Sequence, residues 1–268
     1  MIELSEIQEG LAKEEFFLEY LPTCSLKSNR CVGAEALIRW RRGSTILLPG
    51  EFIPRVENTP FSGLLTYWVI ETVGRELGSW LRTHAGVRLH INVPPEILGR
   101  GGIAYAVAKA GLMDVTHKIV LEVTERGVPD KLGIEALTVA GRYGIQVALD
   151  DVGLEAENLA VLSRAHIDII KVDKSLADKL CDEDGLPQWL QALSAILRVM
   201  PLQVIVEGVE SERQVEKLKV AGIELVQGLY FSARCRPRPL QSLPATGSNC
   251  ERASSSSFLH SGHHPSLQ

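Results

Sequence analysis

The sequence has no apolar run near the roughly 20 residues that a membrane-spanning helix needs, so no membrane span is expected. Its 5 cysteines show no C-x-x-C spacing, so neither a structural zinc site nor a disulfide framework is predicted, and reduced thiols are expected. The first twenty residues lack the basic-then-apolar order of a signal peptide, and a cytoplasmic location is expected. Basic residues are not in excess, with 28 Lys and Arg against 33 Asp and Glu, which argues against a duplex nucleic acid partner.

The composition is otherwise that of an ordinary globular chain of 268 residues, 45% hydrophobic and 23% charged, with a formal net charge of −5. This length suits either one large α/β barrel or two ordinary domains. After about Pro244 the chain becomes serine-rich and has too few apolar residues for a packed core. We therefore predict one folded barrel domain over residues 1–244 and a disordered serine-rich tail over residues 245–268.

Short apolar, β-branched segments alternate with helical patterns along most of the chain. Strands are predicted at Phe16–Leu21, Val32–Ile38, Val87–Asn92, Lys118–Val123, Ile145–Asp150, Ile167–Val172, Gln203–Glu207 and Glu224–Gln227. Helices are predicted at Leu64–Thr83, Ile103–Ala110, Ile134–Tyr143, Leu159–Arg164, Leu186–Val199 and Ser211–Ala221. Ser211 and Gln214 form a capping box that begins the last helix. Left-handed helix ends are expected at Gly111, Gly144 and Gly222.

This alternation predicts an α/β fold, a TIM-like (β/α)8 barrel, with a doubly wound open sheet as the alternative. The connection between the first two strands, Pro22–Cys31, is too short to contain a helix. Because parallel neighbours need a long crossover, we expect an irregular barrel with an antiparallel first strand.

Polar residues recur at or near the carboxyl ends of the predicted strands. They are Glu35, Asn92, Glu122, Asp150, Asp151, Lys171 and Glu207. In a barrel these strand ends meet at one mouth, where the active sites of such folds lie. A single polar group of this kind is more often a satisfied core residue. Its repetition over several strands indicates a site, because a buried charge is costly unless it is paired or bound to a metal.

The charges of this cluster predict a metal site. Its five carboxylates contribute −5 and Lys171 returns +1, so two divalent cations would bring the total to zero. Oxygen ligands without Cys or His favour Mg²⁺ or Mn²⁺ over zinc. Two such ions about 3.5–4 Å apart are a standard arrangement for phosphoryl hydrolysis. Asp150 and Asp151 would point to opposite faces of a regular strand, so we expect the strand to end there and the chain to turn at Gly153.

The same residues lie within a series of ordered motifs. The chain reads Glu35-Ala36-Leu37-Ile38-Arg39-Trp40, followed by GEFIPRVE, HINVP, LEVTE, DDVG, IIKVD, VEGVE and QGLYFS. In this order and spacing the chain resembles the EAL-domain family of cyclic di-GMP phosphodiesterases, from about Ser5 to Leu240. One E-A-L tripeptide would carry no information, whereas the ordered set is specific.

The resemblance implies a barrel that hydrolyses cyclic di-GMP to linear pGpG by two-metal activation of water, with two Mg²⁺ or Mn²⁺ ions per site. The implied metal ligands are Glu35, Asn92, Glu122, Asp150, Asp151 and Glu207. Lys171 would position the attacking water, and Glu35 and Glu207 are the other expected catalytic residues. Arg39 would contact a substrate phosphate, Gln227 would lie near the substrate, and Glu210 would brace the loop after Asp151. Further candidate partners are a second copy of the chain, in a homodimer, and a regulatory protein.

Two departures from the family pattern favour an alternative function. The family usually has Phe-Gly-Thr-Gly-Tyr-Ser-Ser after its two aspartates, whereas this chain has Val152–Asn158, in which Glu155 replaces a glycine. The usual Gln-Pro after the first strand is Leu21-Pro22 here. The alternative is a catalytically weak or silent barrel that acts as a cyclic di-GMP receptor or docking module, and a barrel hydrolase for another phosphate ester is a third hypothesis.

Overall fold

The structure is a computed structural model that describes residues 2–124, 130–152, 166–182 and 185–231. Its strands belong to one sheet: β1 (Phe16–Ser25), β2 (Arg30–Arg42), β3 (Thr45–Leu47), β4 (Arg88–Asn92), β5 (Ile119–Thr124), β6 (Gln146–Val152), β7 (Ile169–Val172), β8 (Gln203–Val206) and β9 (Leu225–Val226). The α-helices are α1 (Leu4–Ala12), α2 (Pro49–Val56), α3 (Pro60–Thr83), α4 (Gly102–Lys109), α5 (Lys131–Arg142), α7 (Lys174–Asp178), α8 (Gln188–Leu197) and α9 (Glu212–Val220). Short 3₁₀ segments are η1 (Pro95–Ile97), η2 (Met113–Lys118) and η3 (Lys179–Cys181).

The sheet closes on itself to form a barrel. Its strand order is β1-β9-β8-β7-β6-β5-β4-β2, and a direct β1–β2 pairing joins the two ends. Strand β1 is antiparallel to both of its neighbours, while β2 and β4 to β9 pair in parallel. The predicted TIM-like barrel with an antiparallel first strand is confirmed, and the open-sheet alternative is wrong, because the β1–β2 pairing leaves no sheet edge where the barrel closes. Strand β3 extends the sheet outside the barrel, beside the end of β2.

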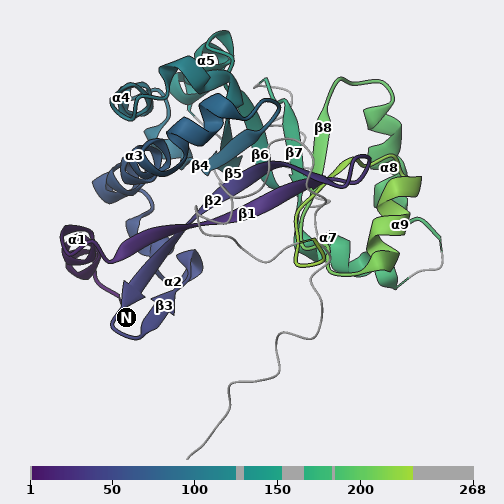
Figure 1. The fold of residues 1–268 in the computed structure, drawn as a ribbon, viewed down its shortest axis with the longest axis horizontal. Helices are drawn as coiled ribbons and strands as arrows, with labels where there is room; N and C mark the ends of the chain where they lie inside the picture. Colours follow the sequence, from purple (N-terminus) through teal and green to yellow (C-terminus); the bar gives the residue numbers. More distant parts are fainter. Residues whose placement is uncertain (1, 125–129, 153–165, 183–184, 232–268) are drawn as a thin grey trace, which may run out of the picture.

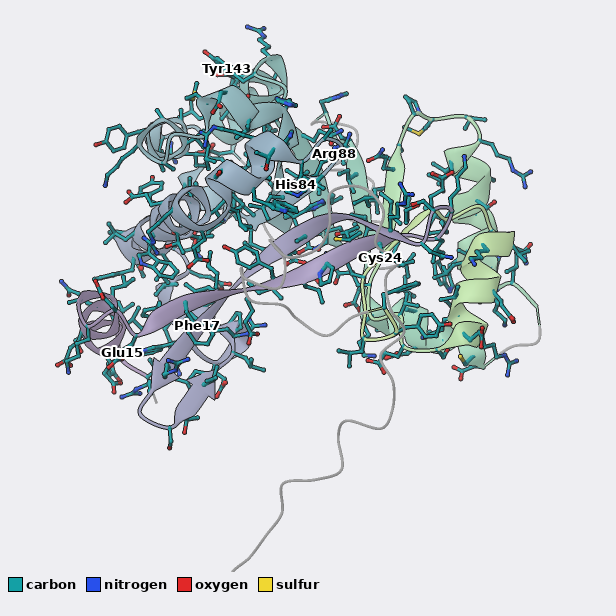
Figure 2. All side chains as sticks on the ribbon, in the orientation of Figure 1. Glu15, Phe17, Cys24, His84, Arg88 and Tyr143 are labelled. Atoms are coloured by element: carbon teal, nitrogen blue, oxygen red, sulfur yellow. The ribbon has the colours of Figure 1, made fainter. Side chains whose placement is uncertain are left out.

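Helices surround this barrel on its outer side. In Figure 1, α3, α4 and α5 lie together on one side of the strands, and α8 and α9 lie on the opposite side. The long strands β1 and β2 cross the view between these two groups. Figure 2 shows Phe17 toward the α1 end of β1 and Cys24 toward the other end, where Cys24 pairs with Val226 of β9.

Inside the barrel, a layer of apolar side chains lies beneath a layer of polar side chains, and these are called the apolar level and the polar level. Val120, Ala148, Ile169 and Ile205 form a separate buried cluster with Leu225 packed against it. Each of these residues lies two positions before a polar residue of the predicted site or its neighbourhood: Glu122, Asp150, Lys171, Glu207 and Gln227. Because alternate residues of a strand share a face, both sets point into the barrel. The apolar set is called the barrel floor below, and the polar set lies above it toward the carboxyl ends of the strands.

Local signals explain many of the element boundaries. Ser211 and Gln214 form the predicted capping box at the start of α9, and Gly111, Gly144 and Gly222 have the expected left-handed backbone. Helices α1, α2 and α7 and strand β3 were not predicted. The predicted helix Leu159–Arg164 and the predicted tail 245–268 lie outside the described residues.

The cysteines and the helices can be compared with the expectations of reduced thiols and of no membrane span. Cys31 and Cys181 are reduced, as expected, whereas Cys24 is disulfide-bonded, which was not predicted. Within the described ranges, no helix is long and apolar enough to cross a membrane.

Candidate active site

The ammonium group of Lys171 lies at the centre of the polar level. Its Nζ is 2.7 Å from Glu207 Oε1, 2.9 Å from Glu122 Oε1, 3.0 Å from Asp150 Oδ1 and 3.1 Å from Glu35 Oε2. These four carboxylates come from β2, β5, β6 and the end of β8, and Lys171 comes from β7. The structure therefore brings together side chains that are 136 positions apart in the sequence, because the strand ends of a closed barrel converge.

Burial and charge shift the pKa values of this cluster strongly. Burial and the neighbouring Glu35 raise the pKa of Glu122 well above its usual range. Burial raises the pKa of Glu207 to about 7, although Lys171 opposes the shift. For Lys171, burial disfavours the charged form, but Glu122, Glu35 and the other carboxylates outweigh it and raise the pKa well above the usual value. The site has more negative charge than one lysine can balance.

Hydrogen bonds also orient the side chains that the sequence predicts as metal ligands. Asn92 Nδ2 donates to Glu35 Oε1 at 2.8 Å, so the amide oxygen of Asn92 is the atom that it could offer to a cation. Lys171 and Asn92 together lower the pKa of Glu35, against the effect of burial. His90 Nδ1 lies 2.8 Å from Glu122 Oε1. Burial and the charge of Lys171 lower the pKa of His90 to about 3, so the imidazole is neutral.

Sequence reasoning did not identify His90. The sequence did contain a signal for His90. It lies two residues before Asn92, so the two side chains are on the same face of β4. A histidine in an apolar strand has several ordinary explanations, and only the register of β4 against β5 places this one near Glu122.

A bulge in β6, and not the predicted turn, brings the side chains of Asp150 and Asp151 to the same site. The strand does not end at Asp150, since β6 continues to Val152. Its pairing with β7 shifts register between Leu149 and Val152, and Asp151 has a left-handed φ of 56°. This bulge turns both aspartates to the same side, so that carboxylate oxygens of Asp150, Asp151 and Glu207 lie within 4.8 Å of one another. The prediction that the strand ends at Asp150 is wrong, and Gly153 lies outside the described residues.

The three residues predicted to bind substrate lie in different environments. Arg39 is buried, and its guanidinium donates to Glu19 Oε2 at 2.8 Å and to the carbonyl oxygen of Ile38 at 2.9 Å. Gln227 is buried at the end of β9, where its Nε2 donates to Thr23 Oγ1 at 3.0 Å.

Glu210 accepts a hydrogen bond from Lys174 at 2.8 Å, and its side chain is half exposed. The loop that it was predicted to brace lies outside the described residues, as does Glu155. The role of Glu210 stays a prediction.

The cluster has the chemistry of a divalent metal site. An ammonium has three N–H donors, and four carboxylates surround that of Lys171. Glu122 Oε2 is buried and has no hydrogen-bond partner among the described residues, whereas Asp150 Oδ1 forms an ion pair with Lys171 Nζ at 3.0 Å. Buried, unpaired carboxylate oxygens are costly unless a cation meets them.

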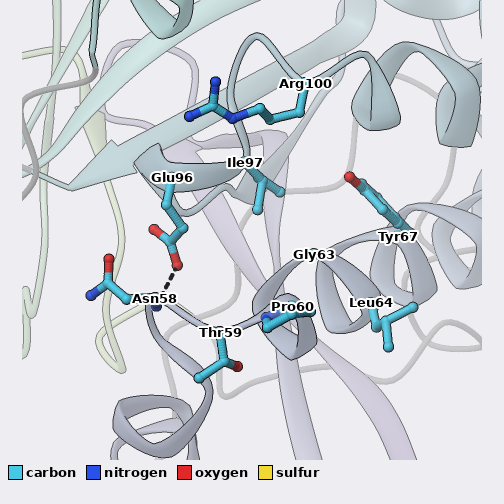
Figure 3. Close-up of a pocket in the computed structure, with 9 residues that line it drawn as sticks. All are labelled: Asn58, Thr59, Pro60, Gly63, Leu64, Tyr67, Glu96, Ile97 and Arg100. Carbon is cyan, nitrogen blue, oxygen red and sulfur yellow. Dashed lines mark hydrogen bonds between the residues drawn. The ribbon is translucent and has the colours of Figure 1, made fainter.

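A separate cavity of about 380 Å³ lies between η1 and the first turn of α3 (Figure 3). Glu96 on one wall accepts a hydrogen bond from the backbone N–H of Asn58 on the other, at 3.0 Å. The lining contains none of the residues predicted for the site. This cavity is therefore distinct from the carboxylate cluster inside the barrel.

Fold and site together define a TIM-like barrel with a lysine-centred acidic cluster at the carboxyl ends of its strands. The chain belongs to the EAL domain family, whose model matches residues 4–234. It is 30% identical over 234 residues to "Probable cyclic di-GMP phosphodiesterase PdeB" of Escherichia coli, which covers 84% of this chain and 44% of that protein. It is 32% identical over 246 residues to "Cyclic di-GMP phosphodiesterase NbdA" of Pseudomonas aeruginosa, covering 89% of this chain and 31% of NbdA. The chain thus spans less than half the length of either relative.

Solved structures share the fold. The EAL enzyme Bd1971, in its cAMP- and cyclic-di-GMP-bound form, superposes with a TM-score of 0.81 at 24% sequence identity. The superposition covers 89% of this chain and 67% of that one.

Proposed function

We propose that this chain is a metal-dependent phosphodiesterase that hydrolyses cyclic di-GMP to linear pGpG. The observation that carries the proposal is the cluster around Lys171, in which four carboxylates from four strands converge on one ammonium. Family membership supports the reaction, and the names of PdeB and NbdA support the substrate.

Two Mg²⁺ or Mn²⁺ ions are the proposed cofactors. Their ligands would be Glu35, Asn92, Glu122, Asp150, Asp151 and Glu207. All six side chains offer an oxygen, and oxygen donors are what these hard cations prefer. When bound, such ions polarise phosphate oxygens and lower the pKa of water.

The chain's own residues then have distinct tasks. A water held beside Lys171 attacks phosphorus in line, the bond from phosphorus to the 3′ oxygen breaks, and that oxygen takes up a proton. The proton of the attacking water passes to solvent, while Glu35 and Glu207 hold Lys171 in place through their ion pairs. Arg39 binds a phosphate oxygen, since a guanidinium suits this geometry. Gln227 lies near the substrate, and Glu210 braces the loop after Asp151.

The test is product chromatography after incubation of the purified chain with cyclic di-GMP and Mn²⁺. We expect linear pGpG from the wild-type chain and none from Glu35→Ala, Asp150→Ala or Glu207→Ala, each of which removes a ligand charge without opening a large apolar cavity. Circular dichroism checks that the variants fold. Near-normal turnover by folded Glu35→Ala at saturating metal would refute the two-metal assignment.

A second candidate function is a catalytically silent receptor for cyclic di-GMP. It is favoured by the sequence of Val152–Asn158, where Glu155 stands in place of the family's glycine beside an acidic site. If Glu155 lowers the affinity of the site for one of the two metal ions, Glu155→Gly should raise turnover. It should also lower the Mn²⁺ concentration needed for half-maximal activity. Tight binding of intact cyclic di-GMP without product, in both proteins, would favour the receptor. A homodimer and a regulatory protein partner stay proposals for either function.

A further inference from the structure

At the level of the barrel floor, β4 contributes a side chain that does not match the apolar floor residues. His90 pairs in register with Val120 of β5, and the floor residues on β5 to β8 are Val120, Ala148, Ile169 and Ile205. His90 is fully buried, with a relative exposure of 2%. An imidazole in such surroundings costs free energy unless its polar atoms are bonded. Its Nδ1 meets this requirement by contacting Glu122 Oε1, one level above, at 2.8 Å.

This contact constrains the Glu122 carboxylate. Oε1 of Glu122 is approached from two sides, by His90 Nδ1 at 2.8 Å and by Lys171 Nζ at 2.9 Å. The other oxygen, Oε2, is buried and has no hydrogen-bond partner among the described residues. With one oxygen held twice, the carboxylate has little freedom to rotate, and Oε2 is the atom left to meet a cation.

The direction of the hydrogen bond follows from the chemistry of ligation. A carboxylate that binds a metal must be ionised, so in the loaded site Glu122 has no proton to donate. The proton between the two groups then belongs to Nδ1 of His90. Groups that donate to metal ligands in this way hold them in orientation, and their loss typically weakens metal binding about 10–100-fold.

We propose that His90 is a positioning residue of the metal site, which holds Glu122 so that Oε2 points to the metal. The inference rests on the proposed metal-dependent function. It concerns a residue that neither the charge arithmetic nor the motif comparison identified. His90 touches neither substrate nor metal, and it acts only through Glu122.

The test is a calorimetric titration of the intact chain with Mn²⁺ in the absence of substrate. His90→Leu removes the donor while keeping an apolar side chain in the floor, and we expect the dissociation constant to rise about 10–100-fold. In His90→Asn the amide nitrogen stands two bonds from Cβ, as Nδ1 does, so this variant should lose less than about tenfold. Should His90→Leu fail to fold, His90→Val takes its place, since valine is the residue of β5 at the same level.

Ile205→Val is the matched control, because it loosens the floor without touching Glu122 and should leave the Mn²⁺ affinity unchanged. Melting temperatures in EDTA measure any purely structural effect separately. Wild-type affinity in a folded apolar variant, or equal losses in His90→Asn and His90→Leu, would overturn the positioning role alone. Absence of Mn²⁺ binding by the wild-type chain would overturn the proposed metal site as well.

Discussion

Lys171 is the residue on which the charge balance of the site depends. It is 1% exposed, and it is within 3.1 Å of a carboxylate oxygen of each of four residues. In the absence of metal it is the cation that offsets their mutual repulsion. Removal of one member of a buried ionic cluster is more damaging than replacement of the whole cluster, because the charges left behind stay buried.

Lys171→Met should therefore destabilise the metal-free protein and also impair catalysis. We expect a loss of about 3–5 kcal/mol in the free energy of unfolding at pH 8, measured by urea titration in EDTA. The loss should be smaller at pH 5, where the carboxylates can protonate. With Mn²⁺ present, kcat should fall at least ~10²-fold. An unchanged single-turnover rate with a weaker substrate affinity would instead make Lys171 a substrate-binding residue.

The raised pKa of Glu207 predicts a pH dependence of stability. Its pKa is about 7 in the folded protein, against an ordinary value of 4.5, so between these pH values the folded state holds more proton than the unfolded state. The corresponding stability is present below about pH 4.5 and is lost as the pH rises through about 7.

In EDTA, the melting temperature of the wild-type chain should therefore fall more steeply between pH 5 and pH 8 than that of Glu207→Gln, which cannot ionise. Saturating Mn²⁺ should reverse the slope for the wild type, because deprotonation then favours metal binding. Parallel pH curves of the two proteins in EDTA would contradict the shift assigned to Glu207.

At the scale of elements, the bulge in β6 is what brings two consecutive aspartates to one site. Asp151 has a φ of 56°, a conformation that Asn and Asp tolerate better than most residues. The backbone conformation and the proposed ligand role thus both favour Asp at this position, and substitutions can separate the two requirements.

Asp151→Asn keeps a side chain suited to the left-handed backbone but removes the charge, whereas Asp151→Ala removes both. We expect Asp151→Asn to leave the urea stability in EDTA within about 0.5 kcal/mol of wild type, and Asp151→Ala to lose about 1–2 kcal/mol. Both should weaken Mn²⁺ binding in calorimetry. Wild-type Mn²⁺ affinity in either variant would exclude Asp151 as a ligand.

At the scale of the whole molecule, the proposed metal site would connect most strands of the barrel. Its proposed ligands come from β2, β4, β5, β6 and the residue that follows β8, and Lys171 adds β7. A cation bound there contacts strands that are neighbours only because the barrel is closed. Metal binding should therefore stabilise the global fold rather than one segment.

At a Mn²⁺ concentration 100 times its dissociation constant, the expected stabilisation is about 2.7 kcal/mol. For a domain of this size that corresponds to a rise in melting temperature of about 5–10 °C. Asp150→Asn should show little of this rise. A similar rise in wild type and Asp150→Asn would place the Mn²⁺ outside the carboxylate cluster.

Much of this organisation was predictable because it depends on local pattern. Each of the eight predicted strands overlaps an observed one, since alternation of apolar runs with helical periods is a local property. The shortness of Pro22–Cys31 alone predicted the antiparallel start. The acidic cluster was predictable because carboxylates recur at strand ends. By contrast, α2 was missed because Gly50 and Pro54 inside it are poor helix formers, and α7 because it has only 5 residues.

The barrel class, the acidic residues at its mouth and their excess of negative charge can be predicted from the amino-acid sequence, since strand periodicity and formal charge are properties of the chain. Which oxygen of each carboxylate has a partner depends instead on how the strands pack in three dimensions. The bulge at Asp151 depends on how β6 pairs with β7, and the contact of His90 with Glu122 depends on how β4 pairs with β5. Register is set by the closure of the whole sheet, and a shift of one residue would turn these side chains out of the barrel.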